Sequence, residues 1–232
     1  MFKAVIVVLC GVLFGAVLKP PQPPAKKTIV YYRGQPLEYI VRGLCYFGVI
    51  VLSVAFACFA ASIVALSGLP ATQTLVPYVC PTEQPVSDVL RRYSLRFAAG
   101  ATFVSAGALL RLWAFRTLGA LFTFEVVITP EHRLIRSGPY AFARHPSYTG
   151  LIMLLFGVHL VQFGHGGYVT ACNIVATPAG FLVYVWWACM VFVPVSLLRR
   201  CYVEDEQLCT HFGDTWLQYE EDVPYRLLPF VY

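Results

Sequence analysis

The chain has 232 residues, of which 58% are hydrophobic and 12% are charged, and its formal net charge is +5. The charged share is about half that of an ordinary soluble domain, so the composition excludes a water-soluble globular protein and indicates a membrane protein. The basic residues form short clusters between apolar runs, which disfavours nucleic acid as a partner. Because no C-x-x-C pair or metal-ligand spacing of histidines occurs, we expect no metal and interpret the cysteines, Cys172 among them, as buried apolar side chains.

Five apolar runs predict an all-α, polytopic integral membrane helical bundle with about five transmembrane helices. The first, 2–18, is near the lower length limit for a span, so a secretory signal stays open beside the retained helix that we predict. The second, from about 44 to 69, is long enough to cross a bilayer with some tilt. After a third run, 95–115, the runs 148–163 and 172–198 follow each other across a short turn and predict a helical hairpin.

Small residues and prolines inside these runs predict how the helices pack. Gly100 and Gly107 permit close helix approach, so we expect the third run to pack inside the bundle. Pro178 and Pro194 predict that the last run is kinked or partly interfacial.

Four parts follow along the chain: a transmembrane helix or signal anchor at 1–18, a basic linker at 19–43, two transmembrane helices at 44–115, and a region at 116–232 with the hairpin and a C-terminal tail. Lys and Arg are absent from 70–88 but recur in the linker, in the loop after residue 115 and at the start of the tail. By the positive-inside rule, the linker, this loop and the tail face the cytosol, and the amino terminus faces the lumen.

Two of these cytosolic segments carry residues that suggest chemistry. The loop 116–147 is long and lacks periodicity, which is typical of a functional loop, and Pro146 favours a helix start at its end. In the tail, Arg200, Glu204 and Leu208 recur every four residues and therefore share one helix face. On residue type alone, the two segments also fit interfacial anchors and a solvent-exposed ion pair.

Taken together, the two segments resemble the isoprenylcysteine carboxyl methyltransferase family. The matching elements are S-G-P-Y-A-F-A-R-H-P-S-Y-T-G at 137–150, R-x-x-x-E-D-E from Arg200, and then H-F-G, Q-Y and V-P-Y-R-L-L-P-F near the end. The resemblance covers the chain from about Phe122 onward. One departure is Asp205, which stands where the family often has a second Glu and is shorter by one methylene.

The resemblance implies methyl esterification, dependent on S-adenosylmethionine, of the C-terminal prenylated cysteine carboxylate of CaaX-processed proteins. It implies that Arg200 and Glu204 are catalytic, with Arg200 facing the substrate carboxylate. The implied cofactor-binding residues, on a cytosolic loop and a C-terminal helix, are His132, Arg133, Leu134, Ile135, Tyr140, His145, Pro146, Ser147, Tyr148 and Glu204. The implied partners are prenylated proteins within membrane lipid, and the implied location is the endoplasmic reticulum with the active site facing the cytosol.

Other functions share part of this pattern, because phospholipid methyltransferases and membrane sterol reductases have similar R-H-P-x-Y strings. The alternatives are a methyltransferase of a lipid amine or a small isoprenoid acid, an NADPH-dependent sterol or steroid reductase, and a non-catalytic membrane scaffold. A carboxylate acceptor needs no general base, since an α-carboxyl group with a pKa near ~3.5 is ionised at neutral pH. The lack of a catalytic dyad in the sequence is therefore consistent with the hypothesis that a carboxylate is methylated to an ester.

Overall fold

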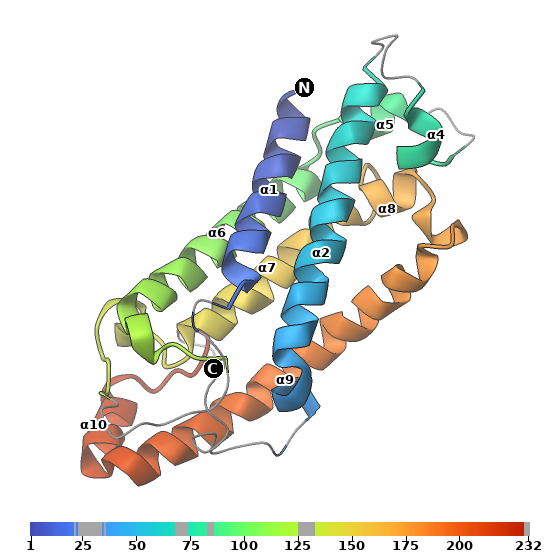
Figure 1. Cartoon of the computed structure of the whole chain (residues 1–232). Coiled ribbons are helices and arrows are strands. Elements are labelled where there is room, and N and C mark those ends of the chain that lie inside the picture. The colour runs from blue at the N-terminus through green and yellow to red at the C-terminus, as the bar shows by residue number, and fades with distance from the viewer. Residues whose placement is uncertain are drawn as a thin grey trace. The chain divides into compact units, whose positions relative to one another are not determined.

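The structure, a computed structural model, describes residues 1–20, 22, 34, 36–67, 74–82, 86–124 and 133–229. Throughout these ranges the regular secondary structure is helical and no strand occurs, so the prediction of an all-α fold is confirmed. The long helices, drawn in Figure 1, are α1 (Phe2–Leu18), α2 (Pro36–Ala65), α6 (Leu95–Leu118), α7 (Pro146–Gln162) and α9 (Gly180–Phe212). The short helices are α4 (Val76–Val79), α5 (Ser87–Arg91), α8 (Tyr168–Ala171) and α10 (Asp214–Asp222), with 3-10 turns at Gly119–Leu121, Gly138–Ala141 and Ile174–Ala176.

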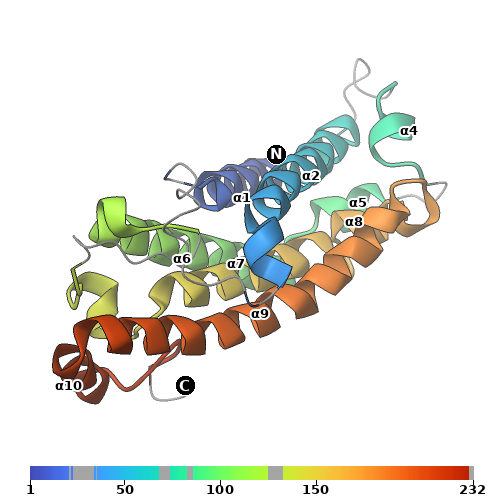
Figure 2. The same ribbon diagram turned by 60° about the horizontal axis from the view of Figure 1, so that its bottom comes forward.

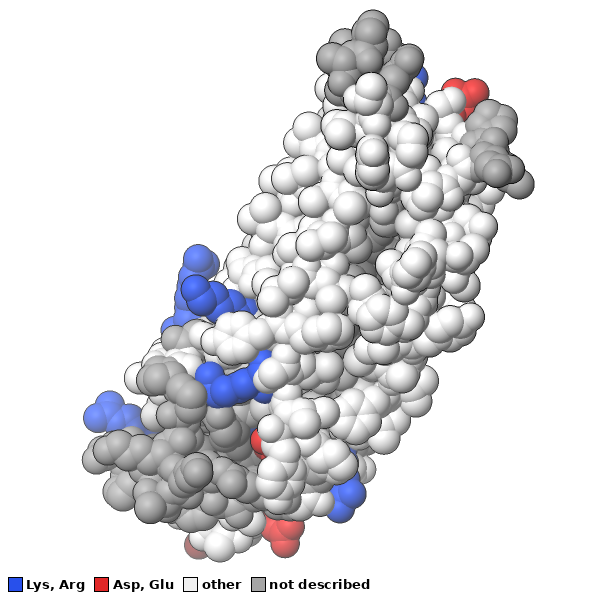
Figure 3. All heavy atoms as spheres, turned by 45° about the vertical axis from the view of Figure 1, so that its right-hand side comes forward, with Lys and Arg blue, Asp and Glu red and all other residues white. Residues whose placement is uncertain are grey.

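Three of the five expected spans are helices long and apolar enough to cross a membrane: Pro36–Ala65, Leu95–Leu121 and Gly180–Phe212. The other two, α1 and α7, are apolar helices of 17 residues each. A helix of that length is about 25 Å long, which is close to the shortest that spans a bilayer. The face in Figure 3 has a broad area without Lys, Arg, Asp or Glu, as a surface in contact with lipid requires.

Two helices, α2 and α9, differ from the prediction in their boundaries. The second helix begins at Pro36 instead of near residue 44, because its first turns contain the charged Glu38 and Arg42, which end the apolar run but not the helix. The last long helix begins at Gly180, so 172–179 lies before it. It then continues through the charged turn to Phe212 with Pro194 inside it, so the predicted span and the predicted tail helix are one element.

The chain forms two compact units, and the long helices contribute residues to both. Unit 1 comprises 1–16, 47–106 and 153–190. Unit 2 comprises 17–46, 107–152 and 191–232.

Within unit 1, helices α6 and α7 touch through glycines. A Cβ atom on Gly100 would lie 2.9 Å from side-chain atoms of Leu160 and Val161, and one on Gly157 would lie 2.6 Å from the backbone nitrogen of Val104. Neither glycine has room for a side chain. The prediction that the small residues of the third run permit close packing is therefore confirmed.

Helix α1 is tied into unit 1 by a buried lysine. The Nζ atom of Lys3 donates to the carbonyl oxygens of Leu90 at 2.7 Å, Arg92 at 3.1 Å and Gly166 at 3.1 Å. The same ammonium group lies 4.7 Å from the ring centroid of Phe97, a cation–π contact. These contacts join α1 to residues that lie 87 to 163 positions later in the sequence.

Unit 1 also contains a disulfide between Cys80 and Cys172, which are separated by 92 residues in the sequence. Cys172 is buried, as predicted, but the interpretation that its side chain takes no part in a disulfide was wrong. Its reason, the absence of a C-x-x-C pair, concerns neighbouring cysteines only, whereas this bond joins two distant connections of the helical fold.

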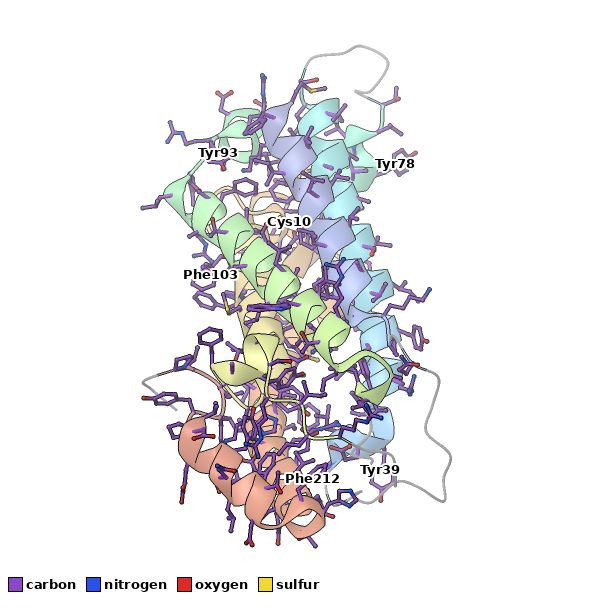
Figure 4. The ribbon with its side chains drawn as sticks, turned by 90° about the vertical axis from the view of Figure 1, so that its left-hand side faces the viewer. Cys10, Tyr39, Tyr78, Tyr93, Phe103 and Phe212 are labelled. Carbon is purple, nitrogen blue, oxygen red and sulfur yellow. A yellow bond between two sulfur atoms is a disulfide. The ribbon has the colours of Figure 1, made fainter. Side chains whose placement is uncertain are left out.

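Unit 2 is closed by the C-terminal segment. Trp216, Tyr219 and Val223 form a buried cluster, against which Phe212 at the end of α9 packs (Figure 4). Figure 2 shows α10 turning back beside the end of α9. The turn between them is at Gly213, whose φ of 53° lies in the left-handed region that favours glycine.

The same segment fixes the R-H-P-S-Y loop by three hydrogen bonds. The backbone N–H groups of Arg144 and His145 donate to the carbonyl oxygens of Tyr225 at 2.9 Å and Arg226 at 2.8 Å. One turn into α7, the hydroxyl of Thr149 donates to a third carbonyl oxygen of this segment, 2.7 Å away. The start of α7 is thus held in place by residues about 80 positions later in the sequence.

Candidate functional site

A pocket lies within unit 2, and most of the predicted site residues line it. Those in the lining are Arg133, Leu134, Ile135, Tyr140, His145, Ser147, Tyr148, Arg200 and Glu204. Pro146 is the first residue of α7, as its predicted helix-starting position requires, but it is not part of the lining. His132 lies outside the described residues. The loop and the charged turn of α9 therefore meet at one pocket, as the two-segment prediction requires.

Arg200 is buried beside two carboxylates. Its Nε atom donates to Oε1 of Glu204 at 2.6 Å, and its Nη1 atom donates to Oε2 of Glu38 at 3.3 Å and to the carbonyl oxygen of Phe124 at 2.7 Å. Its Nη2 atom has no hydrogen-bond partner among the described residues. The charge of Arg200 is therefore balanced by the two carboxylates. The N–H groups of its Nη2 atom remain available to donate to a ligand.

Glu204 is the centre of the hydrogen bonds at this end of the pocket. Besides the bond from Arg200, its Oε1 atom accepts a 2.5 Å hydrogen bond from the Tyr148 hydroxyl, and its Oε2 atom lies 3.4 Å from Nδ1 of His145. The rings of Tyr148 and His145 stack with an interplanar angle of 4°. Motif residues from the start of α7 thus converge on one carboxylate of α9.

His145 lies between two acidic side chains. Its Nε2 atom is 2.9 Å from Oδ1 of Asp205, opposite the contact with Glu204. Burial alone would lower the pKa of His145, but hydrogen bonds to Asp205 and Glu204 and the charges of both outweigh it and raise the pKa to about 8. The ring is therefore a cation at neutral pH, with each N–H facing a carboxylate.

The substitution of Asp for Glu at position 205 does not remove this side chain from the site. Its second oxygen, Oδ2, accepts a 2.8 Å hydrogen bond from Nε of Arg226 and lies 3.5 Å from Nη1 of Arg144. The shorter side chain therefore reaches three cationic partners, among them Arg226 from the C-terminal segment.

Two buried charged residues at the site were not predicted from the sequence: Arg111, which lines the pocket, and Glu38, which pairs with Arg200. Glu38 was assigned to the linker. Arg111 lies inside the 24-residue helix α6, between Arg96 and Arg116 near its two ends, and a buried charge in such an apolar helix is itself a signal of function. Neither Glu38 nor Arg111 belongs to the motifs from which the site was predicted.

Arg111 differs from Arg200 in its partners, which are all uncharged. Its Nε atom donates to the carbonyl oxygen of Val17 at 3.0 Å, and its Nη1 atom donates to Oγ of Ser147 at 2.7 Å and to the carbonyl oxygen of the same residue at 3.2 Å. Its guanidinium carbon lies 4.8 Å from the ring centroid of Phe115. Within the described part of the chain, no carboxylate lies within 4.0 Å of this cation.

Comparison with known proteins supports the motif analysis. Residues 100–185 match the model of the isoprenylcysteine carboxyl methyltransferase (ICMT) family. The chain is 31% identical over 134 residues to protein-S-isoprenylcysteine O-methyltransferase B of Arabidopsis thaliana, covering 57% of this chain and 58% of that protein. It is 31% identical over 150 residues to the protein-S-isoprenylcysteine O-methyltransferase of Rattus norvegicus, covering 61% and 44%.

A second group of relatives is similar over a shorter stretch. The chain is 33% identical over 101 residues to a probable 7-dehydrocholesterol reductase of Acanthamoeba polyphaga mimivirus, covering 43% of this chain and 19% of that protein. The chain spans less than two thirds of the length of each of these relatives. Residues 100–185 thus carry the isoprenylcysteine carboxyl methyltransferase family pattern, and the family resemblance predicted from the motifs is confirmed.

Proposed function

We propose that this chain is a membrane methyltransferase that transfers a methyl group from S-adenosylmethionine to the C-terminal carboxylate of a prenylated cysteine. The observation that carries the proposal is Arg111, a buried cation at a largely apolar pocket with no carboxylate beside it among the described residues. A buried charge without a counter-ion is costly, so such a site favours an anionic ligand. A prenylcysteine supplies both the anion and an apolar chain.

The pocket residues fit the cofactor. The side chain of Glu204 lines the pocket and is 20% exposed, so its carboxylate suits an ammonium group. The buried Nε atom of Arg144 has no hydrogen-bond partner among the described residues and suits an acceptor oxygen. With the motif residues implied by the family resemblance, His132 and Pro146 among them, these groups would hold S-adenosylmethionine. When bound, this cofactor supplies a methyl group already activated as an electrophile.

The protein's own contribution is positioning. The acceptor carboxylate is ionised at neutral pH and is itself the nucleophile, so no residue has to remove a proton. Arg111 attracts the carboxylate, and Arg200, whose Nη2 atom is free of hydrogen bonds to described residues, orients it. Holding the reacting atoms in line supplies several kcal/mol of barrier reduction, roughly 7 or more in favourable cases.

The apolar side of the pocket suits the prenyl chain. Leu37, Val41 and Cys45 recur every four residues along α2 and line the pocket from one side. Leu151 of α7 and Leu197 of α9 add further apolar surface. Burying the apolar surface of the prenyl group stabilises the complex by about 25 cal/mol per Å².

We place the protein in the endoplasmic reticulum, with the linker, the loop 116–144 and the tail in the cytosol. The Cys80–Cys172 disulfide supports this orientation, because such bonds persist in oxidising compartments and Cys80 lies in the segment without Lys or Arg. Protease protection of tags inserted in the linker and after residue 229 tests it. Cleavage of one tag and protection of the other in sealed microsomes contradicts the orientation.

The experiment that tests the function measures transfer of labelled methyl from S-adenosylmethionine to N-acetyl-S-farnesylcysteine in membranes containing the full chain. Release of the label by mild base identifies an ester. A base-stable labelled product on a lipid amine favours the lipid-amine alternative, and the absence of labelled product on either acceptor contradicts carboxyl methylation.

A second candidate, NADPH-dependent sterol reduction, is favoured by the similarity to proteins named as sterol reductases. Thermal stabilisation of the purified chain by NADPH, but not by S-adenosylmethionine, would favour it over methyl transfer. Stabilisation by neither molecule would favour the scaffold alternative.

A further inference from the structure

Glu38 brings a buried negative charge to the site from outside the region that matches the family model. It lies in the first turn of α2, whereas the match covers 100–185. Its side chain is 1% exposed, and its Oε2 atom lies 3.3 Å from Nη1 of Arg200, 162 residues away in the sequence. Its neighbour Tyr39, labelled in Figure 4, is 67% exposed. Glu38 is therefore a buried partner of Arg200, which lines the pocket, and not an exposed residue of a linker.

The two arginines of the pocket consequently have different electrostatic surroundings. Arg200 has two carboxylates within 3.3 Å, those of Glu38 and Glu204, whereas Arg111 has only uncharged partners among the described residues. Charges in a buried site interact several times more strongly than in water. An anion entering this pocket is therefore attracted by Arg111, while the charge of Arg200 is already balanced.

This difference matters for a nucleophilic carboxylate. Two uncompensated guanidinium groups would bind the ground state of the acceptor tightly and lower its reactivity, and binding that is not stronger in the transition state does not raise kcat. A balanced Arg200 can still orient an oxygen through its planar NH₂ group. The acceptor is then held in position without excess attraction.

We propose that Glu38 is a positioning residue for the acceptor carboxylate, acting through Arg200. It holds the Arg200 guanidinium in place from α2, and it cancels the positive charge that would otherwise quench the nucleophile. The proposal rests on the proposed function. It also assigns the N-terminal part of the chain a role in the chemistry that the family match does not cover.

The test uses the purified full chain with Glu38→Gln, which preserves the shape of the side chain and removes its charge. The matched control is Glu206→Gln, the same change at an exposed position of α9. Two probes with the same apolar chain, N-acetyl-S-farnesylcysteine and its uncharged amide, report how strongly the pocket prefers a carboxylate. We expect the carboxylate-to-amide affinity ratio to rise about tenfold in Glu38→Gln and not in the control, because Arg200 then keeps only one of its two carboxylate partners, Glu204.

Turnover gives the second readout. In Glu38→Gln we expect kcat to fall about tenfold or more while KM for the carboxylate stays equal or falls, a split that general loss of structure does not produce. Removing the cation as well, in Glu38→Gln/Arg200→Gln, should return the affinity ratio to that of the wild type. Glu38→Asp, which keeps the charge, should keep the wild-type ratio and serves if the Gln variant does not fold.

The role of Glu38 is overturned if Glu38→Gln keeps the wild-type ratio, weakens both probes equally, or raises the ratio without lowering kcat. Failure of the proposed function has a different signature, because the wild-type chain then methylates no prenylcysteine. In that case the affinity ratio alone decides the role of Glu38 as the residue that balances Arg200. Binding of neither probe by the wild type overturns both proposals.

Discussion

His145 and Asp205 form a hydrogen bond of 2.9 Å, although the two residues are 60 positions apart in the sequence. Because the opposite ring nitrogen faces Glu204 at 3.4 Å, the imidazolium links the R-H-P-S-Y loop to two consecutive residues of α9. The protonation state of one ring therefore controls how the two predicted segments of the site are joined.

The first prediction concerns pH. Because the pKa of His145 is raised to about 8, we expect the methylation rate to fall as pH rises through about 8, where the ring loses one of its two N–H donors. The acceptor carboxylate is ionised throughout this range and adds no change. A pH–rate profile of the wild type and of His145→Gln checks this, since the amide does not titrate. The same descending limb in both would contradict the assignment.

The same ring also makes stability depend on pH. Its pKa is higher in the folded state, about 8, than the ordinary value of 6.5, so its contribution is complete below pH 6.5 and is lost as pH rises through 8. The contribution is about 2 kcal/mol, from ~1.36 kcal/mol per pKa unit. Thermal unfolding in detergent at pH 6 and pH 9 measures it, with His145→Gln as the reference that should lack this change.

The second prediction concerns Asp205→Ala. This change leaves His145, Arg226 and Arg144 without a shared carboxylate, and breaking one partner out of a buried ionic network costs about 3–5 kcal/mol. We expect a lower midpoint of thermal unfolding. Glu206→Ala, an adjacent exposed position, is the control and should shift the midpoint little. Equal midpoints for the two variants would show that the network adds no stability.

The third prediction separates the two arginines. Arg111→Gln should raise KM for N-acetyl-S-farnesylcysteine and reduce the preference for the carboxylate over the amide, because the uncompensated charge is removed. Arg200→Lys keeps its charge and loses the planar fork, so it should lower kcat by about 10²-fold or more. Arg116→Gln, an exposed position of the same helix as Arg111, is the control. Wild-type kinetics for Arg111→Gln would remove it from substrate binding.

The fourth prediction concerns α1. Lys3→Met removes three hydrogen bonds to carbonyl oxygens while keeping the apolar stem, and it should lower stability by about 1–3 kcal/mol. Lys19→Met, an exposed position beyond the other end of the helix, should not. Unfolding midpoints of the two variants, with mass spectrometry of the mature chain, check this. A mature protein that lacks residues 1–18 would contradict a retained α1.

Local patterns were sufficient for the features that depend on neighbouring residues. The apolar run 2–18 ends at Lys19 and Pro20, and α1 has the same bounds because those residues end it. Likewise, His145, Ser147 and Tyr148 belong to one short string, and the helical spacing of Arg200 and Glu204 places them on one face.

Features that depend on distant pairs could not be predicted in this way. The sequence around Glu38 contains no motif. Only its contact with Arg200, 162 positions away, brings it to the site. The Cys80–Cys172 bond joins connections that no spacing rule relates. The continuity of the last span with the predicted tail helix was missed for a different reason, since the apolar run stops near residue 198 while helix-forming charged residues continue the same helix to Phe212.

In that uninterrupted helix, α9, the direction of the site side chains depends on the number of residues that precede them. Each residue of a helix turns the chain by about 100°, so every position between Val191 and Leu197, the part of α9 in unit 2 before the charged turn, helps to set the direction in which Arg200 and Glu204 point. Deleting a single apolar residue there would leave all the reactive side chains present and turn them by roughly a quarter of a turn away from His145. Exchanging one apolar residue of this segment for another keeps that direction, whereas changing their number does not.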